Sequence, residues 1–230
     1  MNFLKNLNGV SLIGIGDISS KGISAVFWFY LATLILPSEY GQIHYFISIA
    51  AIASTISLVG QQNAITVYIS KNKTLVSTLF LTSLLCSIAS LIILTVIFQK
   101  FDVGLLTMGM VLFTHGIATS LGNEDFKTYT IFSILQKILL VVFGLSFYYY
   151  FGVEAILIGI ALSYFVYIKI FYAGLIKFKI DFSELRKNRD FISSNYFIML
   201  TNIVTTQLDK IIIVPILGLT VLGNYSLALQ

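Results

Sequence analysis

The chain has 230 residues, of which 57% are hydrophobic and only 10% are charged. Soluble domains carry about 25% charged residues, so this composition, with a mean hydropathy of +0.93, excludes an ordinary soluble domain and indicates an integral membrane protein. The apolar runs are long and continuous, which favours spanning helices and excludes the short alternating segments of an outer-membrane barrel.

The apolar segments predict seven membrane-spanning helices, most of them joined by short connections that make neighbours antiparallel. The expected limits are residues 10–36, 40–60, 75–98, 103–122, 129–150, 153–176 and 191–218. The predicted fold class is therefore all-α, a polytopic transmembrane helical bundle. The single cysteine, Cys86, lies within a predicted span, so we expect no intrachain disulfide.

The first span is unusual because it carries Asp17 and Lys21 near its middle. A charged residue at the centre of a membrane helix costs about 2.5–3.5 kcal/mol on insertion scales, and such residues usually face an interior or a pathway. Residues four apart lie on one face of a helix, so we expect these two side chains to pair and neutralise each other. Their shared face indicates either the wall of a wet cavity or a neutralised pair buried for packing.

On the fifth predicted span, Lys137 beside Gln136 is a candidate for an anion-binding cavity, with the alternative that Lys137 reaches the headgroups. A second polar stripe lies on the seventh span, where five residues recur at helical spacing: Asn195, Asn202, Thr205, Thr206 and Asp209. Five polar residues ending in an acid favour a cavity wall, and hydrogen bonding between helices is the alternative.

The two histidines, His44 and His115, are candidates for proton relay, and the alternative is a packed or interfacial role. The sequence has no phosphate-binding glycine loop, no metal-ligand cluster and no constellation of an enzyme active site. We therefore expect neither an enzyme nor a cofactor or metal.

Basic residues outside the spans predict the orientation of the chain. With a cytoplasmic N-terminus, nine of them fall on the cytoplasmic side, and only Lys100 falls outside. The nine are Lys5, Lys71, Lys73, Lys127, Lys177, Lys179, Arg186, Lys187 and Arg189. The net charge of +4 thus follows membrane topology, and we expect no nucleic-acid partner. Tyr40 and residues 148–151 are expected to form an aromatic belt at the outer interface.

Residues 219–230 are expected to turn at Gly223-Asn224 and to begin another apolar run. The stretch before this turn echoes residues 31–43, in which an apolar helix end is followed by Gly41-Gln42. Because transporters often contain two repeated halves, seven helices and a short continuation are expected to be part of a larger transporter.

Four segments carry a resemblance to a known family: LPSEYG at residues 36–41, QQNAITVYISKNK at 61–73, NEDFKTY at 123–129, and LDKIII at 208–213 with Gly218, Gly223, Asn224 and Tyr225 after it. In this order and spacing they resemble the polysaccharide-transport branch of the MOP/MATE exporter superfamily, which comprises the Wzx-type O-antigen or capsule repeat-unit flippases. Members of that branch have two lobes, and nearly the whole chain is similar to the first lobe and the start of the second.

The resemblance implies that residues 1–190 form an N-terminal six-helix lobe with a cytoplasmic connector, and that residues 191–230 form the seventh helix and the start of a second lobe. It implies a multi-pass protein of the bacterial inner membrane that flips undecaprenyl-diphosphate-linked oligosaccharide repeat units by alternating access. The implied partners are that lipid-linked oligosaccharide, membrane lipids, H⁺ or Na⁺, and a second lobe or a homodimer partner.

The implied substrate-binding residues are Lys21, Lys137, Asn202 and Gln136, and the implied ion-coupling residues are Asp17 and Asp209. Two alternatives remain open. One is a MATE-like, cation-coupled exporter of small molecules, and the other is an inactive or scaffold membrane protein.

Overall fold

The structure, a computed structural model, describes residues 2–71, 75–177 and 179–230, and every regular element in these ranges is a helix. The elements are α1 (Asn2–Leu34), α2 (Pro37–Leu58), α3 (Gln61–Ser70), α4 (Leu75–Phe98), α5 (Phe101–Gly122), α6 (Phe126–Phe151), η1 (Val153–Ala155), α7 (Ile156–Ser163), η2 (Tyr164–Tyr167), α8 (Ile168–Ile176), α9 (Phe182–Lys187), α10 (Arg189–Leu217) and α11 (Leu219–Ala228). The predicted all-α, polytopic helical bundle is confirmed.

Six helical stretches of the described chain are long and apolar enough to cross a membrane: α2, α4, α5, α6, the run Val153–Ile176, and α10. They coincide with six of the seven predicted spans. The remaining predicted span, residues 10–36, lies almost entirely within α1, which is one continuous helix ending at Leu34. α1 carries Asp17 and Lys21 within its apolar part and is not among the six stretches found in the described chain.

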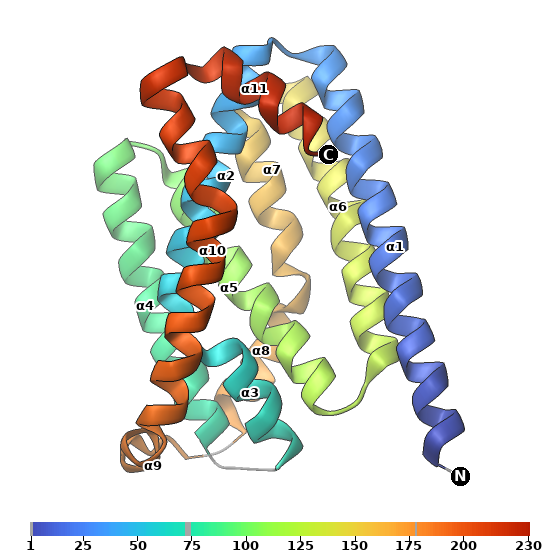
Figure 1. Cartoon of the computed structure of the whole chain (residues 1–230), viewed down its shortest axis with the longest axis vertical. Coiled ribbons are helices and arrows are strands. Elements are labelled where there is room, and N and C mark those ends of the chain that lie inside the picture. Colours follow the sequence, from blue (N-terminus) through green and yellow to red (C-terminus); the bar gives the residue numbers. More distant parts are fainter. Residues whose placement is uncertain (1, 72–74, 178) are drawn as a thin grey trace.

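The long helices run up and down between two ends (Figure 1). The lower end of Figure 1 holds the N-terminus, α3 and α9, and the upper end holds the α1–α2 corner and α11. Seven of the nine basic residues lie in or beside the lower connections: Lys71, Lys127, Lys177, Lys179, Arg186, Lys187 and Arg189. Lys5 lies near the start of α1, and Lys73 lies outside the described residues. The basic residues thus gather at one end, and the assignment of that end to the cytoplasm stays a prediction.

Local details of the backbone differ from what the sequence predicts. Residues 61–70, between the second and third predicted spans, form α3, which begins directly after Gly60. Gly60 adopts φ +71° and lets α10 pack closely, since a Cβ on Gly60 would lie 2.5 Å from the backbone nitrogen of Tyr196. The sixth predicted span, residues 153–176, is confirmed as one helical run, and the 3₁₀ turn η2 interrupts its α-helical form where the Tyr167 ring packs over Gly116. A further difference concerns the end of the chain.

The chain turns at Gly218, not at Gly223-Asn224. Gly218 has φ +86°, a conformation that glycine adopts without strain, and it ends α10. Residues 219–228 are helical throughout, so Gly223 and Asn224 lie inside α11. Glycine followed by an amide residue is a turn signal, but the packing of α11 against α2 overrides it.

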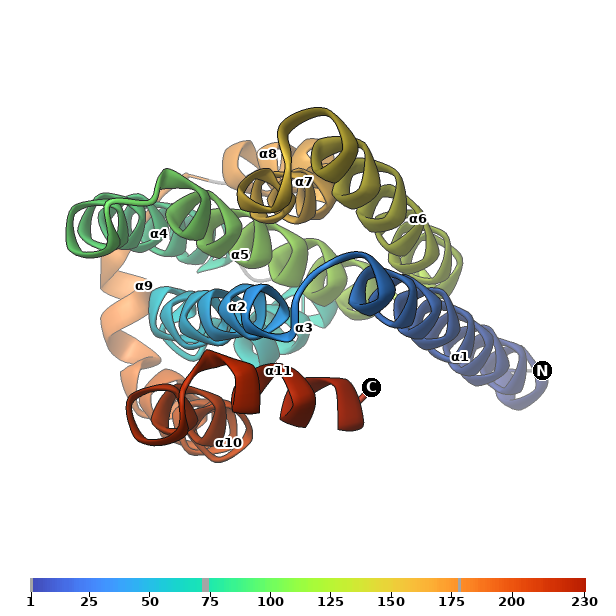
Figure 2. The ribbon, with the colours of Figure 1, turned by 90° about the horizontal axis from the view of Figure 1, so that it is seen from above.

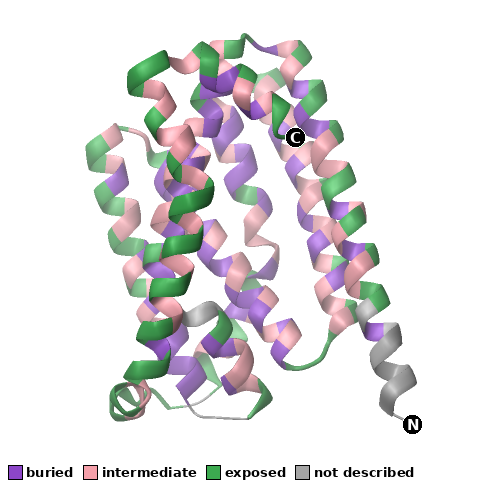
Figure 3. Ribbon diagram, viewed as in Figure 1, coloured by how far each residue is buried: buried purple, intermediate pink, exposed green. Residues whose placement is uncertain are grey.

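Burial concentrates on α2 and α5 at the centre of the bundle (Figure 3). More than half of the residues are buried in the most apolar stretch of α2 and in that of α5, whereas no residue is buried in the most apolar stretch of α10. Hydroxyl and imidazole groups link the interior helices, as between Ser83 of α4 and His115 of α5. α10 therefore stands at the edge of the described bundle and packs mainly on α2, α3 and α11.

The aromatic belt at the upper end is present only in part. Tyr149, Tyr150 and Phe151 are exposed there, as expected. Tyr40, in contrast, is only 2% exposed, because the first turn of α2 points it inward against Trp28. The expectation for Tyr40 was therefore wrong, and its role is internal.

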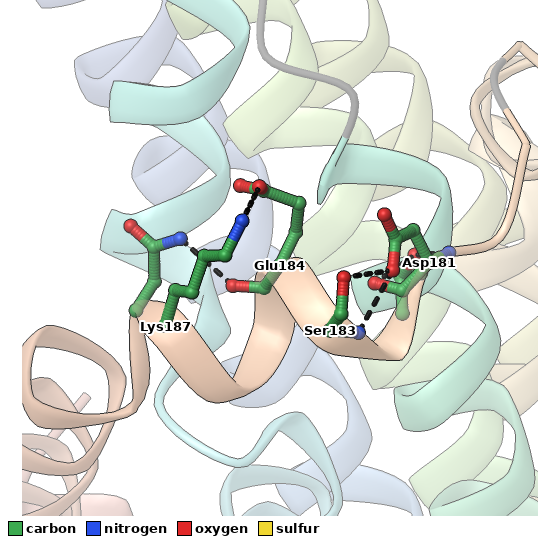
Figure 4. A network of polar contacts seen from close by, with 6 residues as sticks. Asp181, Ser183, Glu184 and Lys187 are labelled. Atoms are coloured by element: carbon green, nitrogen blue, oxygen red, sulfur yellow. Dashed lines mark hydrogen bonds and ion pairs between the residues drawn. The ribbon is translucent and has the colours of Figure 1, made fainter.

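The connector before α10 is a solvated segment with its own polar contacts (Figure 4). Asp181 caps α9, since its carboxylate accepts hydrogen bonds from the backbone nitrogen of Ser183 at 2.8 Å and from its hydroxyl at 2.6 Å. These bonds lower the pKa of Asp181. Lys187 pairs with Glu184 at 3.0 Å, which raises the pKa of Lys187.

Candidate functional site

The polar face of α1 is placed by its packing against α6. The Thr130 hydroxyl donates to the carbonyl of Leu12 at 2.9 Å, and the Tyr148 hydroxyl donates to the carbonyl of Leu34 at 3.1 Å. Gly16 permits this approach, because a Cβ there would lie only 3.1–3.2 Å from atoms of Thr130. α1 and α6 therefore run side by side, as Figure 2 shows, in a fixed register.

Asp17 is held by tyrosine rather than by lysine. Its Oδ1 accepts a hydrogen bond from the Tyr129 hydroxyl of α6 at 2.7 Å, and Asp17 is half-buried. The described residues show no ion pair between Asp17 and Lys21, so the predicted neutralised pair is not formed. Lys21 is exposed on the same helix, one turn further along. A lone cation thus follows an engaged carboxylate on α1.

Lys137 of α6 and Lys21 of α1 lie at similar positions along the two paired helices. Lys137 follows Thr130 by seven residues, two turns of α6, and so falls on the face that contacts α1. Each of these α1–α6 hydrogen bonds joins a residue of α6 to a residue of α1 that lies 112 to 118 positions earlier in the chain. The same offset places Lys137 beside residues 19–25 of α1. Lys137 is partly buried. Two lysines therefore approach one seam from two helices.

Gln136 points elsewhere than Lys137. It is fully buried, and its Nε2 donates to the Ser163 hydroxyl of α7 at 3.0 Å. Its Oε1 has no hydrogen-bond partner among the described residues. The structure thus places Gln136 inside the bundle between α6 and α7, and does not bring it to the α1–α6 seam.

The polar stripe of α10 lines a groove against α2 and α3. The groove has a volume of about 340 Å³, and it is lined by Thr55, Asn63, Ile198, Met199, Asn202, Ile203 and Thr206. Asn202 is exposed to it, and Asn63 contacts Asn195 at 3.5 Å at its lower side. The lining carries amide and hydroxyl groups and no charge. Such a surface offers both donors and acceptors to a neutral polar ligand.

Asp209 is also engaged by a tyrosine. The Tyr225 hydroxyl of α11 donates to Oδ2 of Asp209, while Oδ1 accepts from the backbone nitrogen of Lys210 at 2.8 Å. Lys210 turns to Gln207, to which its Nζ donates at 3.2 Å. Asp209 therefore ties the end of α10 to α11, next to a cation that it does not neutralise.

The two polar stripes lie in different parts of the described structure. α1 packs chiefly on α6, whereas α10 packs on α2, and α11 reaches from α10 toward α1 (Figure 2). Sequence reasoning missed Tyr129 and Tyr225, the partners of both carboxylates. Neither has a local signal, because each meets its aspartate only through the packing of two helices.

Comparison with known proteins gives one finding. The model of a family described as polysaccharide biosynthesis protein matches residues 6–230. No curated protein and no solved structure matches the chain. The helical bundle, the six apolar spans of the described chain and this match point to a multi-pass membrane protein of the transporter type. The chain belongs to the polysaccharide biosynthesis protein family.

Proposed function

We propose that the chain serves to flip undecaprenyl-diphosphate-linked oligosaccharide repeat units across the bacterial inner membrane, by alternating access, for the synthesis of surface polysaccharide such as O-antigen or capsule. Residues 1–190 would form the first lobe of the Wzx-type transporter. Residues 191–230 would open the second lobe, which faces the first across the substrate path. The family match to residues 6–230 supports the polysaccharide part of this proposal.

The observation that carries the proposal is the lone cation on α1. Lys21 is exposed, and the neighbouring carboxylate of Asp17 is bonded to Tyr129 instead. A membrane helix that keeps an unpaired lysine does so at a cost, which a bound anion offsets. Lys137, at nearly the same height on α6, adds a second positive charge. A diphosphate carries the negative charge that two such lysines would hold.

The groove beside α10 would receive the sugar portion. Its uncharged amide and hydroxyl groups, Asn63, Asn202 and Thr206 among them, match the donors and acceptors of a carbohydrate. Gln136 is fully buried and would act only through the packing of α6 against α7. The diphosphate of one lipid-linked substrate would thus bind at α1 and α6, and its sugar portion would bind beside α10.

Asp17 and Asp209 would couple transport to H⁺ or Na⁺. Each is half-buried and bonded to a tyrosine hydroxyl from another helix, Tyr129 or Tyr225. Binding of a cation at either carboxylate would compete with that hydroxyl. Such competition would link ion binding to the contacts α1–α6 and α10–α11.

The test measures binding of undecaprenyl diphosphate to the chain in lipid nanodiscs. Lys21→Gln is expected to weaken binding roughly tenfold or more, since a charge-assisted contact contributes about 1.5–3 kcal/mol. Lys169→Gln is the matched control, because Lys169 is also an exposed lysine on a spanning run. It should leave the affinity unchanged.

This experiment and two further measurements separate the alternatives. Equal affinity of the wild type and Lys21→Gln would overturn the proposal. Binding of organic cations that is lost in Asp209→Asn would instead favour a MATE-like exporter. Restored surface polysaccharide in cells that lack their repeat-unit flippase, by the gene of the wild type and not of Lys21→Gln, would support the flippase.

A further inference from the structure

α11 crosses α2 with its backbone in contact. A Cβ on Gly41 would overlap the carbonyl oxygen of Leu219, and a Cβ on Gly223 would overlap that of Pro37. Both glycines are buried, and α2 and α11 form one of the most extensive helix contacts of the described structure. The two glycines of the sequence echo therefore meet each other at the upper end, where the start of α11 covers the start of α2.

A buried imidazole lies one turn along α2 from this crossing. His44 is only 5% exposed and Tyr40 only 2%. The His44 ring lies 4.5 Å from that of Trp28 on α1 and 4.6 Å from that of Tyr40, measured between ring centroids. Trp28 is itself 7% exposed. The imidazole is thus held between two aromatic side chains, a surrounding that also favours a cation.

Polar atoms on the two crossing helices lack partners. Nε2 of His44, the hydroxyl of Tyr40 and the hydroxyl of Ser226 on α11 are buried and have no hydrogen-bond partner among the described residues. Buried polar groups are bonded in most proteins, and an exception calls for an explanation. Ser226 follows Gly223 by three residues, as His44 follows Gly41. The same turn of each crossing helix therefore carries an unsatisfied polar group.

The charged groups around the ring come from α10. Lys210 lies within electrostatic range of His44, and its Nζ is bonded to Gln207, a neutral group. Asp209 is turned to Tyr225 of α11. On α1 the neighbour of His44 is Trp28, and on α2 it is Tyr40, both neutral. The docked α10–α11 pair thus brings one positive charge toward the ring and keeps the negative charge engaged elsewhere.

We propose that His44 is a proton-binding site whose protonation competes with the docking of α10 and α11 on α2. In the docked state a charged ring would be buried beside Lys210 without a bonding partner at Nε2, which is costly. Separation of α11 at the glycine crossing gives the ring access to water and removes the charge of Lys210. Trp28 and Tyr40 then still flank it and stabilise the imidazolium through their ring faces.

The linkage works in both directions. If undocking raises the affinity of His44 for a proton, proton binding favours undocking by the same factor. The upper end of the bundle would therefore open more readily in acid. This inference does not depend on the proposed substrate, and it adds a site to the two carboxylates considered above.

The chain offers an optical test, because Trp28 is its only tryptophan and His115 its only other histidine. A charged imidazolium in contact with an indole quenches its fluorescence. In nanodiscs, acidification should quench the emission of Trp28 in the wild type and in His115→Gln. His44→Gln should show no such step. A quench that persists in His44→Gln would overturn the proposal.

A second variant tests the competition. Gly223→Ala forces α11 from α2, since its Cβ would overlap Pro37, whereas Gly22→Ala is the control because nothing lies within 4 Å of a Cβ there. The quenching midpoint of Gly223→Ala should lie about one pH unit or more above that of the wild type, a tenfold change in proton affinity. It should be unchanged in Gly22→Ala. Equal midpoints in Gly223→Ala and the wild type, or no quenching in either, would overturn the proposal.

Discussion

At the scale of single residues, tyrosine hydroxyls decide the state of both membrane carboxylates. Asp17 and Asp209 each accept a hydrogen bond from a tyrosine on a neighbouring helix. Among the described residues, no ion pair joins Asp17 to Lys21 or Asp209 to Lys210. Lys21 and Lys210 therefore remain available to anions.

We expect Tyr129→Phe to loosen the attachment of α1 to α6. Hydrogen bonds between membrane helices contribute about 0.6 kcal/mol on average and up to about 1.7. The bond to a carboxylate should lie toward the upper value. Equilibrium unfolding in mixed micelles measures the loss. Tyr172→Phe, at an exposed tyrosine of α8, is the control, and an equal loss in both variants would contradict the role of the Asp17 contact.

At the scale of elements, glycine sets how closely helices approach. Gly159 of α7 lies against the backbone of α6, where a Cβ would be 2.6 Å from the carbonyl oxygen of Phe143. Backbone atoms cannot move aside as a flexible side chain does. The close packing of α6 and α7 therefore depends on a missing side chain, as is common between membrane helices.

Gly159→Ala is expected to destabilise the bundle by about 1–3 kcal/mol, the usual cost of overpacking. Gly22→Ala, at an open position of α1, should instead stabilise it by up to about 1 kcal/mol through helix propensity. Unfolding in mixed micelles compares the two variants. Stability of Gly159→Ala equal to that of Gly22→Ala would show that α6 and α7 can separate without loss.

The cap of α9 predicts a pH dependence in the connector. Hydrogen bonds from Ser183 lower the pKa of Asp181 in the folded state. A carboxyl with a lowered folded pKa stabilises the fold above its unfolded pKa of about 3.9, and this contribution is lost as pH falls through the folded pKa. The protection of α9 should therefore fall between about pH 6 and about pH 2.

Hydrogen exchange followed by mass spectrometry, corrected for intrinsic rates, measures this protection. Asp181→Asn keeps a capping side chain that does not titrate. Its α9 protection should be the same at both pH values. A fall in Asp181→Asn as large as that in the wild type would assign the pH dependence to another group.

At the scale of the whole molecule, the two ends of the bundle differ in charge, and its helices differ in burial. The lower connections carry most of the basic residues, and α10 lies at the edge with no buried residue in its most apolar stretch. A membrane helix that is polar on one face and unburied in the described structure is suited to line the substrate path that we propose. The orientation of that path depends on which end faces the cytoplasm.

The basic bias predicts a cytoplasmic lower end. In a Cys86→Ser background, single cysteines at Lys127 and Lys187 should react with an impermeant thiol reagent only after the cells are opened. A cysteine at Glu154, an exposed residue of the upper end, should react in intact cells. Labelling at Lys127 in intact cells would reverse the orientation.

The sequence by itself determined the membrane class, the positions of the spans and the gathering of basic residues at one end. Each of these depends on composition along a single segment, because a helix satisfies its own backbone in lipid and its length is set by the bilayer. It also pointed to Asp17, Lys21 and Asp209, since a charge within an apolar run is visible without a fold. The family match, over residues 6–230, supports the broad family to which the resemblance pointed.

Only the tertiary structure decided what these residues contact. Spacing within α1 predicted a pair between Asp17 and Lys21, but the register of α1 on α6 brings Tyr129 to Asp17 instead. The crossing of α11 on α2 likewise turns Gly223 from an expected turn into a contact and covers His44. The physical reason is that hydropathy and helical period fix each helix separately. The offset and rotation of one helix against another, which set these contacts, follow from side chains far apart in the sequence.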